Sequence, residues 1–382
     1  MSIPSGVVSI AGTGIEPFLA RHDAPADELA RRALLRAVDD AGVALGDVGL
    51  WVFGSRFEHP GIGQRALFPL GATGATIVNT ENACASGTLG LEIAAAYVAS
   101  GAVAVAVVVG VERLSDVGSS IPLPDWDALG RAGVTHPAKY ALDANRYLTE
   151  HDVDPTALAA VTVKNRSHAA RNPSSRFDAA VTRDEVLRSP MVADPLTRLQ
   201  CCANADGAAA VVVTRADDPV AAGRGVRVLA IETGSGARVD RPVQQPITRR
   251  LGDRAFATAG LRRDDVAVAE VYDAFTILEV LGIEALGFAE PGTAADRVDA
   301  GDFDLGTPGL VVNPGGGLLG RGHPLGASGV AQVIEIADQL RDRAGARQVP
   351  RARYGLVHTL GGNLRAIESN AGAVVLLGGP DA

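Results

Sequence analysis

The sequence predicts a layered α/β fold that is built from two copies of one unit, with a helical insertion in the first copy. Short apolar segments rich in β-branched residues alternate with segments of good helix formers, a pattern typical of a mostly parallel sheet covered by helices. The order of residue types then recurs in the second half of the chain, which indicates a duplication. The stretch 115–199 has no counterpart there and is interpreted as the insertion.

The elements of the first half follow one another in a regular order. Strands are expected at 7–11, 48–53, 75–80 and 103–111, and helices at 25–41 and 88–100. The stretch 88–111 is long enough to span a membrane and carries a single charge, Glu92. Gly101 divides it, however, so we expect a buried helix followed by a buried strand.

The second half begins near Val226 and repeats short motifs of the first half in the same order. The motif Ala41-Gly42 before Asp47-Val48 recurs as Ala259-Gly260 before Asp265-Val266, Ala85-Ser86-Gly87 recurs as Ala327-Ser328-Gly329, and the closing strand 209–213 recurs as 373–377. Each match is short, so the duplication is inferred from the common order of the matches. We expect 1–114 with 200–218 to form the first half, 115–199 the inserted domain and 219–382 the second half.

The insertion contains expected helices near 138–150 and 155–169 and a polar stretch from Lys164 to Arg171. A long insertion after a core strand is usually a lid or a binding lobe, and we expect a lobe here; a solvated helical decoration is the alternative. Such a lobe would lie near Cys84 if the strand ends converge.

Composition narrows the classes of function. The chain has 382 residues, 47% of them hydrophobic, which is ample for a large core, and its net charge is −9 without a long basic run. These features argue against nucleic acid or an anionic membrane as a partner. Three cysteines, two of them adjacent, cannot form a disulfide framework, and the N-terminus shows no signal-peptide pattern, so a reducing cytoplasm is expected. No cysteine or histidine has the spacing of a zinc site, so no metal is expected.

The segment from Asn82 to Gly87 reads NACASG and places one thiol between an expected strand and an expected helix. A helix N-terminus stabilises a thiolate, and we expect it to lower the pKa of Cys84 from about 8.5 into the range of roughly 3.5–7.5. The small neighbours let a substrate approach closely. A buried structural cysteine is the alternative, and this segment alone leaves both open.

A second segment, 313–329, is dense in glycine and contains GRGHPLGASG. It matches neither a P-loop nor a dinucleotide-binding fingerprint. His323 occupies the turn of the second half that corresponds to the Cys84 turn, so the duplication predicts that the two side chains approach each other across a pseudo-twofold axis. A cysteine and a histidine that meet in this way form an activated nucleophile with its base.

Two further segments end expected strands of the second half. Tyr272 lies in VYDAFT at 271–276, and His358 begins HTLGGN at 358–363. Tyr272 can donate a hydrogen bond to a developing oxyanion, and so can the backbone around Gly361. For Tyr272 and His358 the alternative is a buried, hydrogen-bonded structural side chain.

With these motifs in place, the chain resembles the thiolase superfamily over essentially its whole length. The nucleophile motif at 82–87, the motif GHPLGASG at 322–329 and the duplicated halves carry the resemblance. The segment 194–209 together with Lys-Asn-Arg at 164–166 is similar to the sterol-carrier-protein-type, lipid-transfer-protein-like branch, which includes archaeal thiolases, phloroglucinol-type C-acetyltransferases and steroid side-chain aldolases. The resemblance implies a five-layer α-β-α-β-α fold with an inserted loop domain, and a homodimer.

The resemblance also implies a chemistry. Cys84 would accept an acyl group as a thioester from an acyl-CoA, His323 would activate the thiol, and the backbone N–H groups of Cys84 and Gly361 would form the oxyanion hole. No cofactor would be bound, because the coenzyme A thioester is a substrate; the insertion would hold it, through contacts that the motifs do not assign. Relatives of this branch often work with a separate OB-fold and zinc-ribbon protein, and a role in lipid metabolism is implied.

The sequence departs from the thiolase pattern at the second cysteine. The Cys-x-Gly-Gly motif of many thiolases reads Thr359 to Gly362 here, and the His-Asp-Cys-Phe motif of animal sterol-carrier-type thiolases reads Tyr272 to Phe275. Phloroglucinol-type enzymes also combine cysteine and histidine with a tyrosine at the position of Tyr272. The aldolases share that tyrosine but tend to carry a tyrosine in place of His323.

We therefore expect an acyl-CoA-dependent C-acyltransferase that works by ping-pong transfer from Cys84 to a carbon nucleophile, with Tyr272 or His358 assisting the acceptor. A retro-aldolase that cleaves a β-hydroxyacyl-CoA, with Tyr272 as acid and base, is one alternative. A non-catalytic lipid-transfer or scaffold protein is the other, although a scaffold has no chemical use for both Cys84 and His323.

Overall fold

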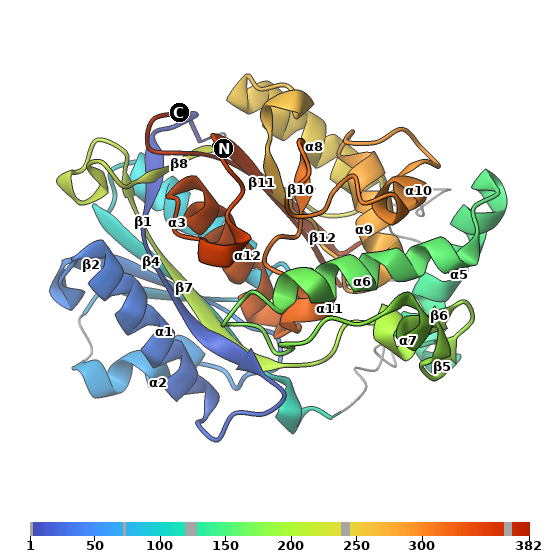
Figure 1. Cartoon of the computed structure of the whole chain (residues 1–382). Helices are drawn as coiled ribbons and strands as arrows, with labels where there is room; N and C mark the ends of the chain where they lie inside the picture. The colour runs from blue at the N-terminus through green and yellow to red at the C-terminus, as the bar shows by residue number, and fades with distance from the viewer. Residues whose placement is uncertain (1–2, 72–73, 119–127, 238–244, 363–368) are drawn as a thin grey trace.

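Ten strands form one continuous sheet in a computed structural model that describes residues 3–71, 74–118, 128–237, 245–362 and 369–382 (Figure 1). The strands of the first half are β1 (Val8–Leu19), β2 (Val48–Gly54), β3 (Thr76–Thr80), β4 (Val105–Arg113) and β7 (Asp206–Arg215). Those of the second half are β8 (Val226–Gly234), β9 (Val268–Glu270), β10 (Val311–Val312), β11 (Tyr354–Gly361) and β12 (Ala371–Gly378).

The strand order shows the duplication directly. The first half runs β3-β2-β4-β7-β1, and the second half continues with its own strands in the mirrored order β8-β12-β11-β9-β10. In each half the outermost strand pairs are parallel, β2 with β3 and β4, and β9 with β10 and β11. An antiparallel contact between β1 and β8 joins the halves.

The expectation of a mostly parallel sheet is wrong, because β1, β7, β8 and β12 all pair antiparallel with their neighbours. The reason is clearest for β12, which follows β11 after a short connection. A parallel strand needs a crossover of a dozen or more residues, so a short connection leaves only antiparallel pairing.

Helices separate and cover the two halves of the sheet. They are α1 (Ala26–Ala41), α2 (Ile62–Leu67) and α3 (Ser86–Ala99) in the first half, and α8 (Pro246–Ala259), α9 (Thr276–Ala285), α10 (Ala294–Asp299), α11 (Gly317–Arg321) and α12 (Leu325–Leu340) in the second. Helices α3 and α12 pack on each other between the halves, α1 covers the first half from outside, and α8 covers the second (Figure 1). The fold is therefore the expected five-layer α-β-α-β-α arrangement.

Close packing at the centre of the molecule depends on glycine. A Cβ atom at Gly326, in the first turn of α12, would lie 2.4 Å from the carbonyl oxygen of Gly54 and 2.7 Å from that of Val111. A Cβ at Gly87, in the first turn of α3, would lie 2.7 Å from the carbonyl oxygen of Gly326. The N-terminal turns of both central helices thus meet each other and the ends of β2 and β4.

The stretch between β4 and β7 forms a lobe with its own helices. Its elements are α4 (Ala128–Arg131), α5 (His136–His151), α6 (Leu158–Ala169), α7 (Arg183–Arg188) and the small hairpin of β5 (Met191–Ala193) and β6 (Leu196–Thr197). Helix α6 lies against α9, α10 and α11, which ties the lobe to the second half (Figure 1). Within the described ranges no helix is long and apolar enough to cross a bilayer, and the stretch 88–111 forms α3 and β4.

Candidate active site

A cavity of about 620 Å³ opens where the N-terminal ends of the central helices face the lobe. Cys84, just before α3, and His323, just before α12, both line it. Tyr272 reaches it from the segment after β9, and Tyr140 and Phe177 reach it from the lobe. The cavity is thus built from both halves of the fold and from the insertion.

The thiol and the imidazole are in contact at the bottom of this cavity. His323 Nε2 lies 3.2 Å from Cys84 Sγ, and the two side chains come from opposite halves of the chain, as the duplication predicts. The Cys84 turn is held in shape by Ser86, whose hydroxyl accepts from the Asn82 N–H at 2.8 Å and donates to the Ala83 carbonyl at 2.6 Å. Ala83 has φ 50°, a left-handed conformation that is uncommon for a residue with a side chain and often marks functional sites.

A hydrogen-bond chain behind His323 assigns its tautomer. Ser328 Oγ lies 2.9 Å from the Pro324 carbonyl oxygen and 2.7 Å from His323 Nδ1. A carbonyl only accepts, so the single serine proton goes to Pro324 and the hydroxyl oxygen accepts from Nδ1–H. His323 Nε2 therefore carries the lone pair, and that lone pair faces the Cys84 thiol.

Burial keeps this pair neutral at rest. Burial raises the pKa of Cys84, and the hydrogen bond from Tyr272 opposes this rise without overcoming it. Burial, followed by the positive charge of Arg321, lowers the pKa of His323 to about 3. The expectation that the helix N-terminus lowers the pKa of Cys84 is therefore wrong: only 9% of the residue is exposed, and the loss of hydration outweighs the amide groups around it.

Tyr272 stands beside both partners. Its hydroxyl lies 3.3 Å from His323 Nε2, and the same hydroxyl hydrogen-bonds to the Cys84 thiol. Burial raises the pKa of Tyr272, so it stays a phenol and acts as a hydrogen-bond donor. The structure thus brings three of the four proposed side chains to one point.

His358 does not reach the cavity. Its Nε2 contacts the Thr248 hydroxyl at 3.0 Å, and its Nδ1 accepts a 3.4 Å hydrogen bond from the backbone N–H of Tyr272. Burial lowers its pKa to about 3, so the ring is neutral. His358 therefore supports the Tyr272 backbone from behind. Its neighbour Thr359 turns toward α3, where the Thr88 hydroxyl lies 2.8 Å away.

The backbone proposed for the oxyanion hole lies against the nucleophile segment. A Cβ at Gly361 would lie 2.3 Å from the Asn82 carbonyl oxygen and 3.0 Å from Ala85 N, so the end of β11 packs directly on the Cys84 turn. The next residue, Gly362, lines the cavity and donates its N–H to the thiol, which lowers the pKa of Cys84. The sequence did not single out Gly362. Asn363, the last residue of that motif, lies outside the described residues.

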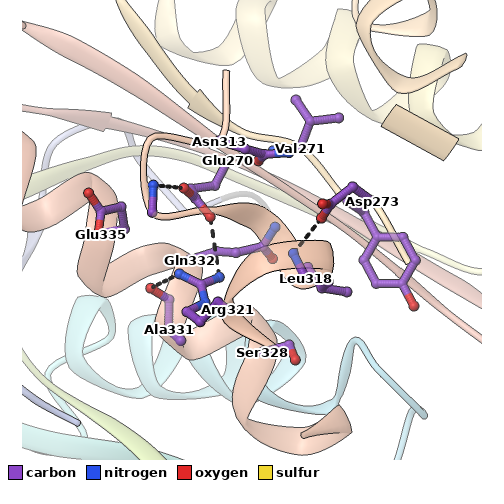
Figure 2. A network of polar contacts seen from close by, with 12 residues as sticks. Glu270, Val271, Asp273, Asn313, Leu318, Arg321, Ser328, Ala331, Gln332 and Glu335 are labelled. Atoms are coloured by element: carbon purple, nitrogen blue, oxygen red, sulfur yellow. Dashed lines mark hydrogen bonds and ion pairs between the residues drawn. The ribbon is translucent and has the colours of Figure 1, made fainter. Parts of the chain in front are cut away.

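A buried polar network behind Tyr272 was also missed. The Asp273 carboxylate accepts from the backbone N–H groups of Leu318 and Leu319 at 2.6 and 3.2 Å and from the Asn165 side chain at 2.7 Å. Figure 2 shows Asp273 pointing at Leu318. The polar stretch of α6 was expected in a binding lobe, but Asn165 is fully buried. The signal was present in the sequence as polar side chains inside an otherwise apolar helix.

A second buried network fixes the segment that leads to His323. The Glu270 carboxylate, at the end of β9, accepts from the Gly315 N–H at 2.9 Å and forms an ion pair with Arg321 at 3.2 Å (Figure 2). Arg321 ends α11, and Gly322 then turns the chain with φ 93° and ψ 166°, a conformation that glycine adopts readily. His323 follows directly, so its direction is set by buried charges and by one glycine.

The wall of the cavity is basic although the chain is acidic overall. Four arginines line it, namely Arg56, Arg166, Arg176 and Arg198. No aspartate or glutamate of the described residues joins them. The guanidinium groups of Arg166 and Arg176 lie 3.8 and 5.1 Å from the centre of the Phe177 ring. Such a wall favours a ligand that carries negative charge.

Comparisons with known proteins show what this chain is similar to. A family model described as the thiolase N-terminal domain matches residues 6–217, and one described as thiolase C-terminal domain-like matches 235–376. An acetyl-CoA acetyltransferase of Methanothermobacter thermautotrophicus is 36% identical over 93% of this chain and 96% of its own. Sterol carrier protein 2 of Gallus gallus is 33% identical over 93% of this chain and 69% of its own. The solved structure of an Ltp2-ChsH2(DUF35) aldolase superposes with a TM-score of 0.85 at 25% identity and covers 99% of both chains.

Proposed function

From the premise that this chain belongs to the thiolase family, in its sterol-carrier-protein-type branch, we propose that it is an acyl-CoA C-acyltransferase that carries the acyl group on Cys84. The observation that carries the proposal is the 3.2 Å contact between Cys84 Sγ and the basic nitrogen of His323. A thiol paired with a neutral imidazole is an activated nucleophile.

In the first half-reaction, Cys84 attacks the carbonyl carbon of an acyl-CoA while His323 Nε2 accepts its proton. The backbone N–H groups of Cys84 and Gly361 stabilise the negative oxygen of the tetrahedral intermediate. Coenzyme A then leaves, and the acyl group remains on Cys84 as a thioester. Because Cys84 and His323 are both neutral before the reaction, charge develops on them only when the sulfur attacks.

In the second half-reaction, a carbon nucleophile attacks the thioester and takes the acyl group. Tyr272, held by His358 through its backbone, donates a hydrogen bond next to the reacting sulfur. The arginines of the wall and the neighbouring lobe bind the phosphates of coenzyme A. The enzyme needs no bound cofactor for these steps, because the thioester itself supplies the activated acyl group.

The proposal includes a second copy of the chain and a separate partner protein. We propose a homodimer, which sedimentation analysis tests. The Ltp2-ChsH2(DUF35) aldolase is, as its name says, an assembly with ChsH2, and by analogy we propose an OB-fold and zinc-ribbon partner for this chain. Equal turnover with and without such a partner would remove that part of the proposal. The described cysteines are all free, as a cytoplasm would keep them.

The test of the nucleophile is intact-protein mass spectrometry after brief mixing with acetyl-CoA and with longer acyl-CoAs. The wild type is expected to gain the mass of the acyl group, and Cys84→Ala is expected to gain none. Lack of an adduct with every donor, with the partner protein supplied, would overturn the proposed function.

The structural similarity to an aldolase favours one other candidate function. In that case the enzyme cleaves a β-hydroxyacyl-CoA, Tyr272 serves as acid and base, and Cys84 is dispensable. The two functions are separated by a pair of variants. The lyase predicts that Cys84→Ala retains cleavage and Tyr272→Phe loses it, whereas acyl transfer predicts that Cys84→Ala is inactive.

A further inference from the structure

In acyl transfer to carbon, the proton on the acceptor carbon still has no residue assigned to accept it. The inference below rests on the function proposed above. The acceptor carbon must lose its proton before it attacks the thioester. The two positions that carry a second cysteine in relatives hold Thr359 and Ala274. The Thr359 hydroxyl is occupied by Thr88 in the middle layer, and alanine has no proton to exchange.

The cavity contains few side chains that can move this proton. No carboxylate of the described residues lines it. His323 Nε2 already serves the Cys84 thiol, and the Tyr272 hydroxyl is engaged with the same pair. The remaining lining groups of a type that exchanges protons readily are His136 and the two thiols Cys201 and Cys202, so position has to decide between them.

The backbone holds Cys202 between the two segments that carry the other reacting groups. On one side, the Cys202 N–H donates to the Ala274 carbonyl at 2.9 Å, two residues after Tyr272. On the other side, the His323 N–H donates to the carbonyl of Ala203 at 3.0 Å. The segment that carries Cys202 therefore lies between the Tyr272 segment and the His323 segment.

The electrostatics of the site is consistent with this placement. Burial, then negative charge on Cys201 and on Cys84, raises the pKa of Cys202. Burial and charge on Cys84 are the main causes of the raised pKa of Tyr272, and charge on Cys202 adds to them. The adjacent Cys201 has a different environment, because its thiol donates to the Thr197 carbonyl at 3.5 Å.

We propose that Cys202 is the second catalytic thiol and that it carries the proton of the acceptor carbon. In the first half-reaction, the Cys84 proton passes to His323 as the sulfur bonds to the acyl carbon and the bond to the CoA sulfur breaks. The departing CoA thiolate takes the Cys202 proton. An imidazolium on His323 and a thiolate on Cys202 result, and because burial raises the pKa of Cys202, this thiolate is a strong base toward the acceptor carbon.

In the second half-reaction, the Cys202 thiolate takes the proton of the acceptor carbon. The electron pair of that C–H bond forms the new C–C bond to the acyl carbon, and the bond from this carbon to Cys84 breaks. The Cys84 sulfur then takes its proton back from His323. Both thiols and the neutral imidazole are restored, and no external acid, base or oxidant is consumed.

The test separates the two half-reactions in Cys202→Ser, with the adjacent Cys201→Ser as the matched control. Acylation of Cys84 by acetyl-CoA, followed by intact mass, is expected to survive in both variants. Exchange of the acetyl-CoA methyl protons with D2O, and product formation, are expected to fall by about 10²–10⁴-fold in Cys202→Ser alone, the usual contribution of a general acid–base group. Wild-type exchange in Cys202→Ser would overturn the inference and leave acylation by Cys84 untouched.

A rescue extends this test, and a labelling experiment in the wild type covers the case in which Cys202→Ser fails to fold. Moving the thiol to the hydrogen-bonded neighbour, in Cys202→Ser/Ala274→Cys, is expected to restore at least part of the exchange. In the wild type with Cys84 already acetylated, bromoacetyl-CoA is expected to alkylate Cys202. Alkylation exclusively at other residues would contradict the proposed role.

Discussion

The hydrogen bond from His323 to Ser328 gives the sharpest prediction about the nucleophile. Ser328→Ala removes the acceptor of the Nδ1 proton and leaves that buried N–H without its partner, since His323 is only 5% exposed. An unsatisfied buried donor costs about 1–3 kcal/mol. The cheapest relief is the other tautomer, which moves the proton to Nε2 and removes the base from Cys84.

We therefore expect Ser328→Ala to slow the acylation of Cys84 by about 5- to 150-fold, the rate equivalent of 1–3 kcal/mol. The assay is single-turnover acylation by acetyl-CoA, quenched on the millisecond scale and read by intact mass. Ser328→Thr retains a hydroxyl and is expected to recover much of the rate. Acylation of Ser328→Ala at the wild-type rate, with its melting temperature lowered, would show that Ser328 is only structural and would refute the tautomer argument.

Three further predictions follow from burial at and around the site. The pKa of His323 is lowered to about 3 and that of Cys84 is raised, so the pair stays neutral. The acylation rate should therefore be flat from about pH 5 to about pH 8. An inflection near 6.5, the ordinary pKa of histidine, would contradict this. Gly326→Ala places a Cβ 2.4 Å from the Gly54 carbonyl oxygen and should cost about 1–3 kcal/mol or more in urea unfolding, whereas an unchanged midpoint would show that the central helices can move apart. Lys164→Met leaves its partner Glu279, 3.0 Å away, as an unpaired buried charge and should lower the free energy of unfolding by about 3–5 kcal/mol. The additional change Glu279→Gln should recover most of this loss in the same assay.

The fold and the central pair could be read from the sequence because they follow from repetition. In a duplicated unit the corresponding turns face each other, so the contact between Cys84 and His323 could be predicted from the sequence. The structure places the two side chains in contact. The pKa of Cys84 could not be read in this way. It depends on how completely other elements cover the thiol, and that quantity belongs to the packed molecule.

The positions of the remaining site residues depend on contacts that no sequence motif reveals. His358 lies inside β11 and Tyr272 follows β9, yet one ring contacts α8 and the other lines the cavity. Side chains alternate across a strand, and the register of a strand is set by its neighbours. Cys202 was visible only as part of an adjacent pair of cysteines. Its relation to Ala274 appears when two distant segments are hydrogen-bonded to each other.

The tautomer of His323 also bears on which reaction this site performs. A lyase that bypasses the thiol gains nothing from a lone pair aimed at Cys84, and a scaffold protein tolerates either tautomer. Here the Pro324 carbonyl orients the Ser328 hydroxyl, the hydroxyl accepts the Nδ1 proton, and the lone pair on Nε2 points at the sulfur. Each link in this chain is buried, so water cannot substitute for a missing partner. Such an arrangement has a chemical use only if the sulfur gives up its proton, and that is the first step of acyl transfer.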